Sequence, residues 1–471
     1  MSDVLTKFQI SDWDQQLVML RDTATADAVT KWIGEAAVAE LKLLDDGTHL
    51  GGGKRNMIVV PGVMGSMLQS EGYAGVWWVD IPRALSQLNQ LALDPDGTRD
   101  IDPLADVKPC AIDLTYAPLR QAVPRSGDFG GTVQFPYDWR KPLAASADDL
   151  RKLVEKTYEE AGEPVHLVGH SMGGLMIRVA LMRHGDSMWS KVGKIVFVGT
   201  PHYGATAIAG YLKNHLWGWE LMAVLGAYLS RETFRSLWGV LSLLPAPSGV
   251  YPGTRSGGPH PCANFDIYDA EAWKLGLTAP ETLQLQRVLQ AAEQQHRDLF
   301  NWHMGLSPSE WRRMLQISGV GLKSLFRLEV KPGWLGLWTD VDRITARKPG
   351  DPNRDGDGRV PLASAQLENV THRYVRGAHG GLHNIPSVIT DMLNWIAERD
   401  LGLPDNPQDA LSSHLASTEP SVAPTLDGSG VRLPNDDSYD RYRDVPPETV
   451  NQLCKMAERG ELQDLNLLRL L

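Results

Sequence analysis

The chain has 471 residues, of which 42% are hydrophobic, and a formal net charge of -11. This length and composition are typical of a globular protein with a sizeable core, and they exclude a disordered chain. Acidic and basic residues are spread along the sequence without a long basic run, so we expect no nucleic-acid partner.

The cysteines and the apolar segments bear on compartment and membrane attachment. Cys110, Cys262 and Cys454 are odd in number and far apart, which favours neither a disulfide framework nor a zinc cluster. The segment MSDVLTKFQISDWDQQ has no basic or apolar region of a secretory signal. The apolar stretch 216–229 contains Glu220 and is shorter than the ~20 residues of a membrane span. We therefore predict a soluble, cytoplasmic protein.

Short apolar runs alternate with helical patterns in the first half of the chain. Met57–Val60, for example, is an apolar run stopped by Pro61 and Gly62, as expected of a buried strand. Strands are expected at 57–60, directly before Pro136, at 165–168 and at 195–198; helices are expected at 146–162, opened by a capping-box-like Ser146, and at 175–184. This order predicts an α/β fold with a mostly parallel, doubly wound sheet.

The pattern changes between about 205 and 310, where segments rich in Trp, Leu, Gly and Pro precede a helix. We interpret this region as an inserted helical cap or lid. Strand-like runs return at 315–319 and 326–330, and a last helix is expected at about 386–397. The predicted organisation is a helical extension (1–50), an α/β domain with its cap (51–402), a linker (403–445) and a short helical tail (446–471).

The segment Gly169-His-Ser171-Met-Gly173 matches the G-x-S-x-G pattern of a serine nucleophile. The bare pattern is weak, because chance gives roughly 0.1–0.3 matches in a chain of this length. Its context is more specific, since an apolar run leads into the serine and a helical pattern follows. A sharp strand-to-helix turn would project the Ser171 hydroxyl from the sheet, with a helix N-terminus directed at the reacting oxygen. We predict Ser171 as the nucleophile; a structural glycine-rich turn is the alternative.

A serine nucleophile needs a base, and the base needs an acid that orients it. His379 and His383 both lie directly before the last predicted helix, where this fold carries its base. We favour His379, because glycines follow it in a loop, and we leave His383 as the alternative. Asp357 precedes Gly-Arg-Val-Pro at a tight turn and is the preferred acid, with Asp355 as the alternative.

Two other histidines and a calcium-loop pattern offer competing interpretations. His170 should point away from Ser171, and His202 is expected to line the pocket or hold a loop. Residues 351–356 begin like an EF-hand loop, but its twelfth position would be Leu362, where a glutamate is required. We therefore expect no metal and no cofactor.

Acyl transfer also needs two N–H donors for the developing oxyanion. The backbone of Met172, directly after the nucleophile, is expected to supply one. The loop Pro61-Gly-Val-Met-Gly65 follows an early strand and should supply the other, with Val63 preferred over Met64. A plain strand-ending turn is the alternative for this loop.

Several segments together resemble the lecithin:cholesterol acyltransferase and lysosomal phospholipase A2 family. They are VVPGVMGSML (59–68), FPYDWRKP (135–142), HLVGHSMGGL (166–175), GTPHYGA (199–205), LLP (243–245), GDGRVPLASA (356–365) and HGGLHNIP (379–386). The resemblance implies an α/β-hydrolase with a cap over a lipid-binding cleft, which cleaves acyl esters of phospholipids. It carries the nucleophile to Ser171 and the acid to Asp357, and it implies that Asp138 and Arg140 are structural partners. The chain departs from the family pattern at Arg359, where the family has Thr.

We therefore expect a serine-dependent lipid acyl-ester hydrolase that works through an acyl-serine intermediate. The alternatives are an O-acyltransferase, in which an alcohol replaces water, and a non-catalytic lipid-binding protein. Trp217, Trp219 and Trp238 in the cap either contact a membrane surface transiently or pack the cap against the core. The sequence favours the packing role slightly.

Overall fold

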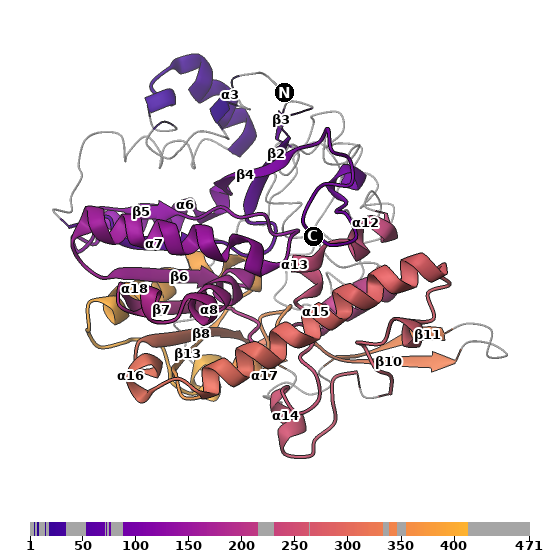
Figure 1. Cartoon of the computed structure of the whole chain (residues 1–471). Helices are drawn as coiled ribbons and strands as arrows, with labels where there is room; N and C mark the ends of the chain where they lie inside the picture. Colours follow the sequence, from indigo (N-terminus) through magenta and orange to yellow (C-terminus); the bar gives the residue numbers. More distant parts are fainter. Residues whose placement is uncertain are drawn as a thin grey trace, which may run out of the picture.

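A computed structural model describes residues 4, 7–8, 15, 18–33, 53–70, 72, 75–76, 88–214, 230–262, 264–332, 339–345 and 355–412. At its centre lies a six-stranded sheet in the order β13-β8-β7-β6-β1-β5, in which each neighbouring pair is parallel (Figure 1). The strands are β1 (Met57–Val60), β5 (Thr132–Gln134), β6 (Val165–His170), β7 (Val192–Val198), β8 (Met314–Val320) and β13 (Thr371–Arg376). The predicted parallel α/β-hydrolase sheet is confirmed.

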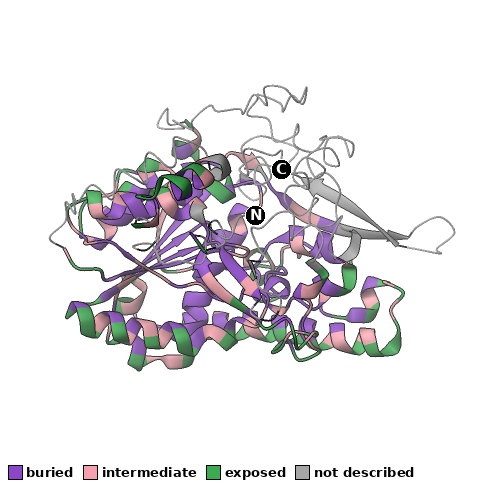
Figure 2. Cartoon of the chain, turned by 90° about the horizontal axis from the view of Figure 1, so that it is seen from above, coloured by how far each residue is buried: buried purple, intermediate pink, exposed green. Residues whose placement is uncertain are grey.

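Side chains of the central strands alternate between two apolar layers, which makes the fold doubly wound. On β7, Ile195 and Phe197 belong to one layer, whereas Val196 and Val198 belong to the other. The first layer is completed by α7 (Ala147–Ala161) and α8 (Met172–His184), and the second by α6 (Ala117–Arg125) and α18 (Pro386–Ile396). Figure 2 shows the buried strands at the centre and exposed helix faces towards the rims. Strands buried on both faces explain the continuous apolar runs in the sequence.

Three local predictions need correction or extension. The run 326–330 does form a strand, β10 (Leu325–Pro332), but it pairs with β11 (Thr339–Thr345) in a separate antiparallel hairpin. Ser146 makes no side-chain cap, because a 3-10 turn, η3 (Leu143–Ser146), runs directly into α7. β13 was not predicted, because this strand lies at the sheet edge and its polar sequence THRYVR gives no apolar run.

The predicted cap region contains helices and no strand within its described residues. Its elements are α10 (Thr206–Asn214), α12 (Arg231–Arg235), α13 (Trp238–Leu241), α14 (Pro252–Arg255), η4 (Ala270–Trp273) and α15 (Ala279–Met304), followed by α16 (Pro308–Trp311). The long helix α15 crosses the molecule (Figure 1). Trp238 is half-buried and packs against Gly97, where an added Cβ would lie 2.4 Å from the indole. Trp217 and Trp219 lie outside the described residues.

The remaining elements are short. They are α3 (Thr23–Ile33), η1 (Leu88–Leu91), η2 (Leu114–Tyr116), α9 (Asp186–Trp189), α17 (Leu362–Ala365), η6 (His379–Asn384) and α19 (Pro407–Ser412), the three-stranded sheet of β2 (Ser66–Ser70), β3 (Gly75–Val76) and β4 (Val107–Ile112), and the pair β9 (Leu322–Lys323) and β12 (Asp355–Gly356). Within the segment predicted as a linker, Ala410 of α19 packs against Val320 and Tyr374. The tail 446–471 lies outside the described residues, and within the described part of the chain no helix has the length and apolarity of a membrane span.

Two buried histidines of α15 make the stability of the fold depend on pH. The Nε2 atoms of His296 and His303 each lie 2.8 Å from a main-chain oxygen, of Leu244 and of Glu368, so both imidazoles donate there. Burial, followed by the nearby Arg178 cation, lowers the pKa of each histidine to about 4. In the unfolded chain the histidine pKa is about 6.5.

We expect the free energy of unfolding to fall as the pH drops from 6.5 towards 4. In this range the unfolded chain binds protons that the folded histidines do not, at a cost on the order of 3 kcal/mol for each histidine. Urea titrations at both pH values would measure the loss, and His296→Gln should reduce it because glutamine donates without titrating. An equally steep loss in the variant would contradict this assignment.

Candidate active site

Ser171 occupies the sharp turn between β6 and α8. Its backbone has φ 51° and ψ -126°, a strained conformation for a residue with a side chain. The flanking glycines are required by close backbone approach: a Cβ on Gly173 would lie 2.2 Å from the carbonyl oxygen of Val60, and one on Gly169 would lie 2.7 Å from Gly174. The G-x-S-x-G spacing therefore allows β6, α8 and β1 to meet behind a serine that begins a helix.

His379 lies between Ser171 and Asp357 and contacts both. Its Nε2 is 2.9 Å from the Ser171 hydroxyl oxygen, and its Nδ1 is 2.7 Å from Oδ2 of Asp357. Because a carboxylate accepts, Nδ1 carries the proton and Nε2 accepts from the serine. All three side chains are buried. Ser171 and His379, which are 208 positions apart, thus form one hydrogen-bonded chain with Asp357, in the order that nucleophilic catalysis requires.

The Asp357 carboxylate is held on both oxygens. Oδ1 accepts from the backbone N–H groups of Arg359, at 3.0 Å, and Val360, at 2.7 Å, which leaves Oδ2 for His379. The main-chain N–H of His379 also donates to the carbonyl of Asp357, at 2.9 Å. This geometry fixes the carboxylate in its turn and orients the imidazole. The side chain of the alternative acid, Asp355, and residues 351–354 lie outside the described residues.

The other histidines contact different groups. His383 is buried, stacks on Tyr116 with ring centroids 4.2 Å apart, and has Nε2 3.4 Å from the Thr115 carbonyl. His202 has Nε2 2.8 Å from Gln316 and Nδ1 3.3 Å from Arg178, so it holds buried parts of α8 and β8 together. The hydrogen bond to the Ser171 hydroxyl thus places His379, and not His383, at the nucleophile.

The loop 61–65 lies directly beside the nucleophile. A Cβ on Gly62 would be 2.9 Å from Cβ of Ser171, and the N–H of Gly65 donates to the Gly62 carbonyl at 3.0 Å, closing a turn. Met64 takes the left-handed φ of 63° that this turn requires. Val63 is half-buried in the turn, and Met172 is the first residue of α8. That their N–H groups receive an oxyanion stays a prediction.

The FPYDWR segment fastens this loop from behind. The Tyr137 hydroxyl donates to the Pro61 carbonyl at 3.1 Å, and the Trp139 indole N–H donates to the Ser66 carbonyl at 3.2 Å. These bonds give a physical reason why the PGVMGS and FPYDWR segments occur together.

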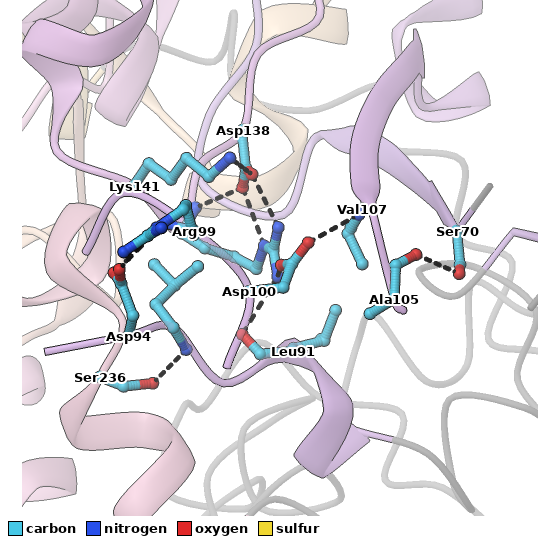
Figure 3. Close-up of polar contacts among 12 residues, drawn as sticks. Ser70, Leu91, Asp94, Arg99, Asp100, Ala105, Val107, Asp138, Lys141 and Ser236 are labelled. Carbon is cyan, nitrogen blue, oxygen red and sulfur yellow. Dashed lines mark hydrogen bonds and ion pairs between the residues drawn. The ribbon is translucent and has the colours of Figure 1, made fainter. Parts of the chain in front are cut away.

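Arg140, in the same segment, is the centre of a buried ion-pair network. Its guanidinium bonds Asp138 through Nε and Nη2, at 2.9 and 2.7 Å, and Asp100 and the Leu91 carbonyl through Nη1, at 2.7 and 3.2 Å. Figure 3 labels these partners, Asp138, Asp100 and Leu91. Despite burial, the paired carboxylates raise the pKa of Arg140. The network joins FPYDWR to residues 91–107, and the contacts agree with the structural role that the resemblance implied.

Gly319 on β8 lies behind the acid and allows it to approach the sheet. A Cβ at this position would be 2.5 Å from Cβ of Asp357. We expect Gly319→Ala to displace Asp357 from His379. This should lower kcat by about 10- to 100-fold, because moving a catalytic group by an ångström has effects of this size. Gly253→Ala is the matched control, because nothing lies within 4 Å of its added Cβ. Steady-state kinetics with an ester should separate the two; equal kcat values would contradict the role of this close approach.

Some of the segments described above are also similar to known proteins. Residues 130–251 match the model of the lecithin:cholesterol acyltransferase family. The chain is related to this family. The matched quarter of the chain contains FPYDWR, Ser171 and GTPHYGA but neither Asp357 nor His379, so the placing of those two rests on the geometry described above.

Individual relatives agree over short stretches. A phosphatidylcholine-sterol acyltransferase from Gerbilliscus gambianus is 38% identical over 60 residues, 12% of this chain and 20% of the relative. The lecithin-cholesterol acyltransferase-like 4 protein of Arabidopsis thaliana is 28% identical over 127 residues, 25% of this chain and 21% of the relative. The chain thus spans about a fifth of the length of these relatives. Among solved structures, a chain of the Tle4–Tli4 complex has a TM-score of 0.48 at 15% identity, covering 73% of this chain and 97% of that one.

Proposed function

We propose that the chain is a serine-dependent hydrolase of lipid acyl esters, acting through an acyl-serine intermediate on Ser171. The observation that carries the proposal is the hydrogen-bonded chain from the Ser171 hydroxyl through His379 to Asp357. The family match supports an acyl ester of a lipid as the substrate class.

In the proposed mechanism the Ser171 oxygen attacks the ester carbonyl while its proton moves to Nε2 of His379. Asp357 stabilises the resulting imidazolium through its 2.7 Å contact with Nδ1. The carbonyl oxygen gains negative charge, which the N–H groups of Met172 and Val63 would stabilise at the helix N-terminus and the adjacent loop. The tetrahedral intermediate then collapses: Nε2 returns the proton to the leaving alcohol, and the acyl group stays on Ser171. Water, activated by the same histidine, releases the acid.

An alcohol acceptor in place of water would make the same site an O-acyltransferase. One relative named above is a phosphatidylcholine-sterol acyltransferase and the other is a lecithin-cholesterol acyltransferase-like protein, which favours this as the second candidate. The two reactions share acylation and differ in which nucleophile reaches the acyl-serine. A non-catalytic lipid-binding protein is the third candidate, and the complete Ser–His–Asp chain argues against it. We also propose lipid as the partner, with transient membrane contact through the cap.

Release of fatty acid from phosphatidylcholine vesicles and from p-nitrophenyl butyrate tests this function. We expect turnover that Ser171→Ala removes and that Ser256→Ala, a serine replacement on the exposed surface, preserves. A long-chain alcohol added to the vesicles separates the candidates: new acyl ester at the expense of free acid supports transfer. Equal turnover in Ser171→Ala and wild type would contradict both catalytic candidates.

A further inference from the structure

His170, the residue directly before the nucleophile, is buried with 7% of its surface exposed, and its two ring nitrogens contact two parts of the site. Nδ1 lies 2.8 Å from the Tyr116 hydroxyl, and Nε2 lies 3.0 Å from the main-chain oxygen of His379. The same hydroxyl is 2.9 Å from the backbone nitrogen of Gly62, in the loop beside Ser171. One imidazole therefore joins the loop to the base.

The chemistry of these groups determines the direction of each bond. A carbonyl oxygen accepts, so Nε2 of His170 carries the proton and Nδ1 is an acceptor. The Tyr116 hydroxyl then donates to Nδ1, and its oxygen accepts from the N–H of Gly62. Burial, with the neighbouring His383 and His379, keeps the pKa of His170 well below its ordinary value, so the ring stays neutral as this arrangement requires.

We infer that His170 and Tyr116 form a positioning pair, which holds the loop 61–65 and the base His379 in register with Ser171 during acyl transfer. Through Tyr116 the pair fixes Gly62, whose added Cβ would lie 2.9 Å from Cβ of Ser171. Through Nε2 of His170 the pair fixes the main-chain carbonyl of His379. The main-chain N–H of His379 is already bonded to the Asp357 carbonyl. The inference rests on the proposed function, because register matters only if the site transfers acyl groups.

Neither residue touches the reacting atoms in this arrangement, so the pair should act on kcat and leave KM nearly unchanged. Donors that stabilise an oxyanion act in the transition state, and one such donor contributes about 10²- to 10³-fold. Loosening the loop without removing its donor should have a smaller effect, about 10- to 100-fold in kcat. The affinity for an arylboronic acid, which forms a tetrahedral adduct on the serine, should fall in parallel.

Three variants separate the two halves of the pair. Tyr116→Phe removes the hydroxyl that bonds Gly62. His170→Gln can keep the donor towards His379 and lose the acceptor for Tyr116, whereas His170→Leu loses both. We expect Tyr116→Phe and His170→Gln to lower kcat similarly, and His170→Leu to lower it further. The double variant Tyr116→Phe/His170→Leu should lower kcat by less than the product of the two single losses, because both replacements remove the bond between Tyr116 and His170. Tyr158→Phe on α7 is the matched control and should retain wild-type kcat.

All rates are taken per active site, titrated to saturation with a fluorophosphonate. A merely structural role would reduce the number of titratable sites and leave turnover per site unchanged, and that result would overturn the inference. Additive losses in the double variant, or kcat within about twofold of wild type in both Tyr116→Phe and His170→Leu, would also overturn it. If the wild type shows no turnover that depends on Ser171, that result contradicts the proposed function instead.

A second measurement does not depend on turnover or on the stability of the variants. ¹⁵N NMR of the histidine rings in the wild-type chain should show His170 neutral, with the proton on Nε2, at pH 7. A proton on Nδ1 would overturn the inference, because Tyr116 could not then donate to that nitrogen.

Discussion

His379→Ala is expected to lower kcat by about 10⁴-fold or more, with little change in the free energy of unfolding. The variant removes the atom 2.9 Å from the Ser171 hydroxyl, so no group accepts the serine proton during attack. Members of such a chain act as a unit, and removing one of them has effects of this size in other serine hydrolases. Steady-state kinetics with p-nitrophenyl butyrate, together with urea titration, measures both quantities.

His383→Ala is the matched control, since it replaces another buried histidine of the same 3-10 turn. Its ring stacks on Tyr116 and contacts the Thr115 carbonyl rather than Ser171. We expect kcat within about tenfold of the wild type. If His383→Ala lost activity and His379→Ala retained it, the base would have to be reassigned.

Arg140→Met should destabilise the fold by about 3–5 kcal/mol, the cost of removing one partner from a buried ion pair. The replacement has a similar length but leaves Asp100, which is 8% exposed, without the Arg140 cation. Asp138, which is 6% exposed, keeps only the longer contact with Lys141, at 3.4 Å. The bond from the Leu91 carbonyl is also lost. Urea-induced unfolding should show a lower midpoint with an unchanged slope.

Arg297→Met supplies the comparison on the surface of α15. Arg297 pairs with Glu293 at 2.6 Å but is 44% exposed, and such pairs contribute about 0.3–0.5 kcal/mol. If the two variants lost equal stability, the buried network would not have the structural role assigned to it. Arg140→Met should also reduce activity near its unfolding midpoint, because Tyr137 and Trp139 in the same segment fasten the loop 61–66.

The parts of this fold that the sequence predicted are those with a local signal. β1, β6 and β7 are largely buried and carry short apolar runs, MIVV in β1, LV in β6 and IVFV in β7, each strand lying next to a glycine or proline. The turn at Ser171 could be predicted because close approach of β1 and α8 permits only glycine at position 173. The edge strand β13 carries polar residues and has no such signal.

Contacts between distant segments could not be predicted in this way. Tyr116 was not expected in the site, because its bonds to Gly62 and His170 each join residues 54 positions apart and leave no periodic pattern. His170 was expected to point away from Ser171, and its ring does bond Tyr116 and His379 instead. The sequence offered His379 and His383 as alternatives, and geometry separates them because one of the two imidazoles lies between the serine and the aspartate.

Covalent labelling tests the central claim, that Ser171 is an activated nucleophile, most directly. Wild-type chain, Ser171→Ala and Ser256→Ala are treated with a fluorophosphonate probe, and the modified peptide is identified by mass spectrometry. We expect one adduct on Ser171 in the wild type and in Ser256→Ala, and none in Ser171→Ala. Undiminished labelling of Ser171→Ala, or no labelling of the folded wild type, would contradict the claim.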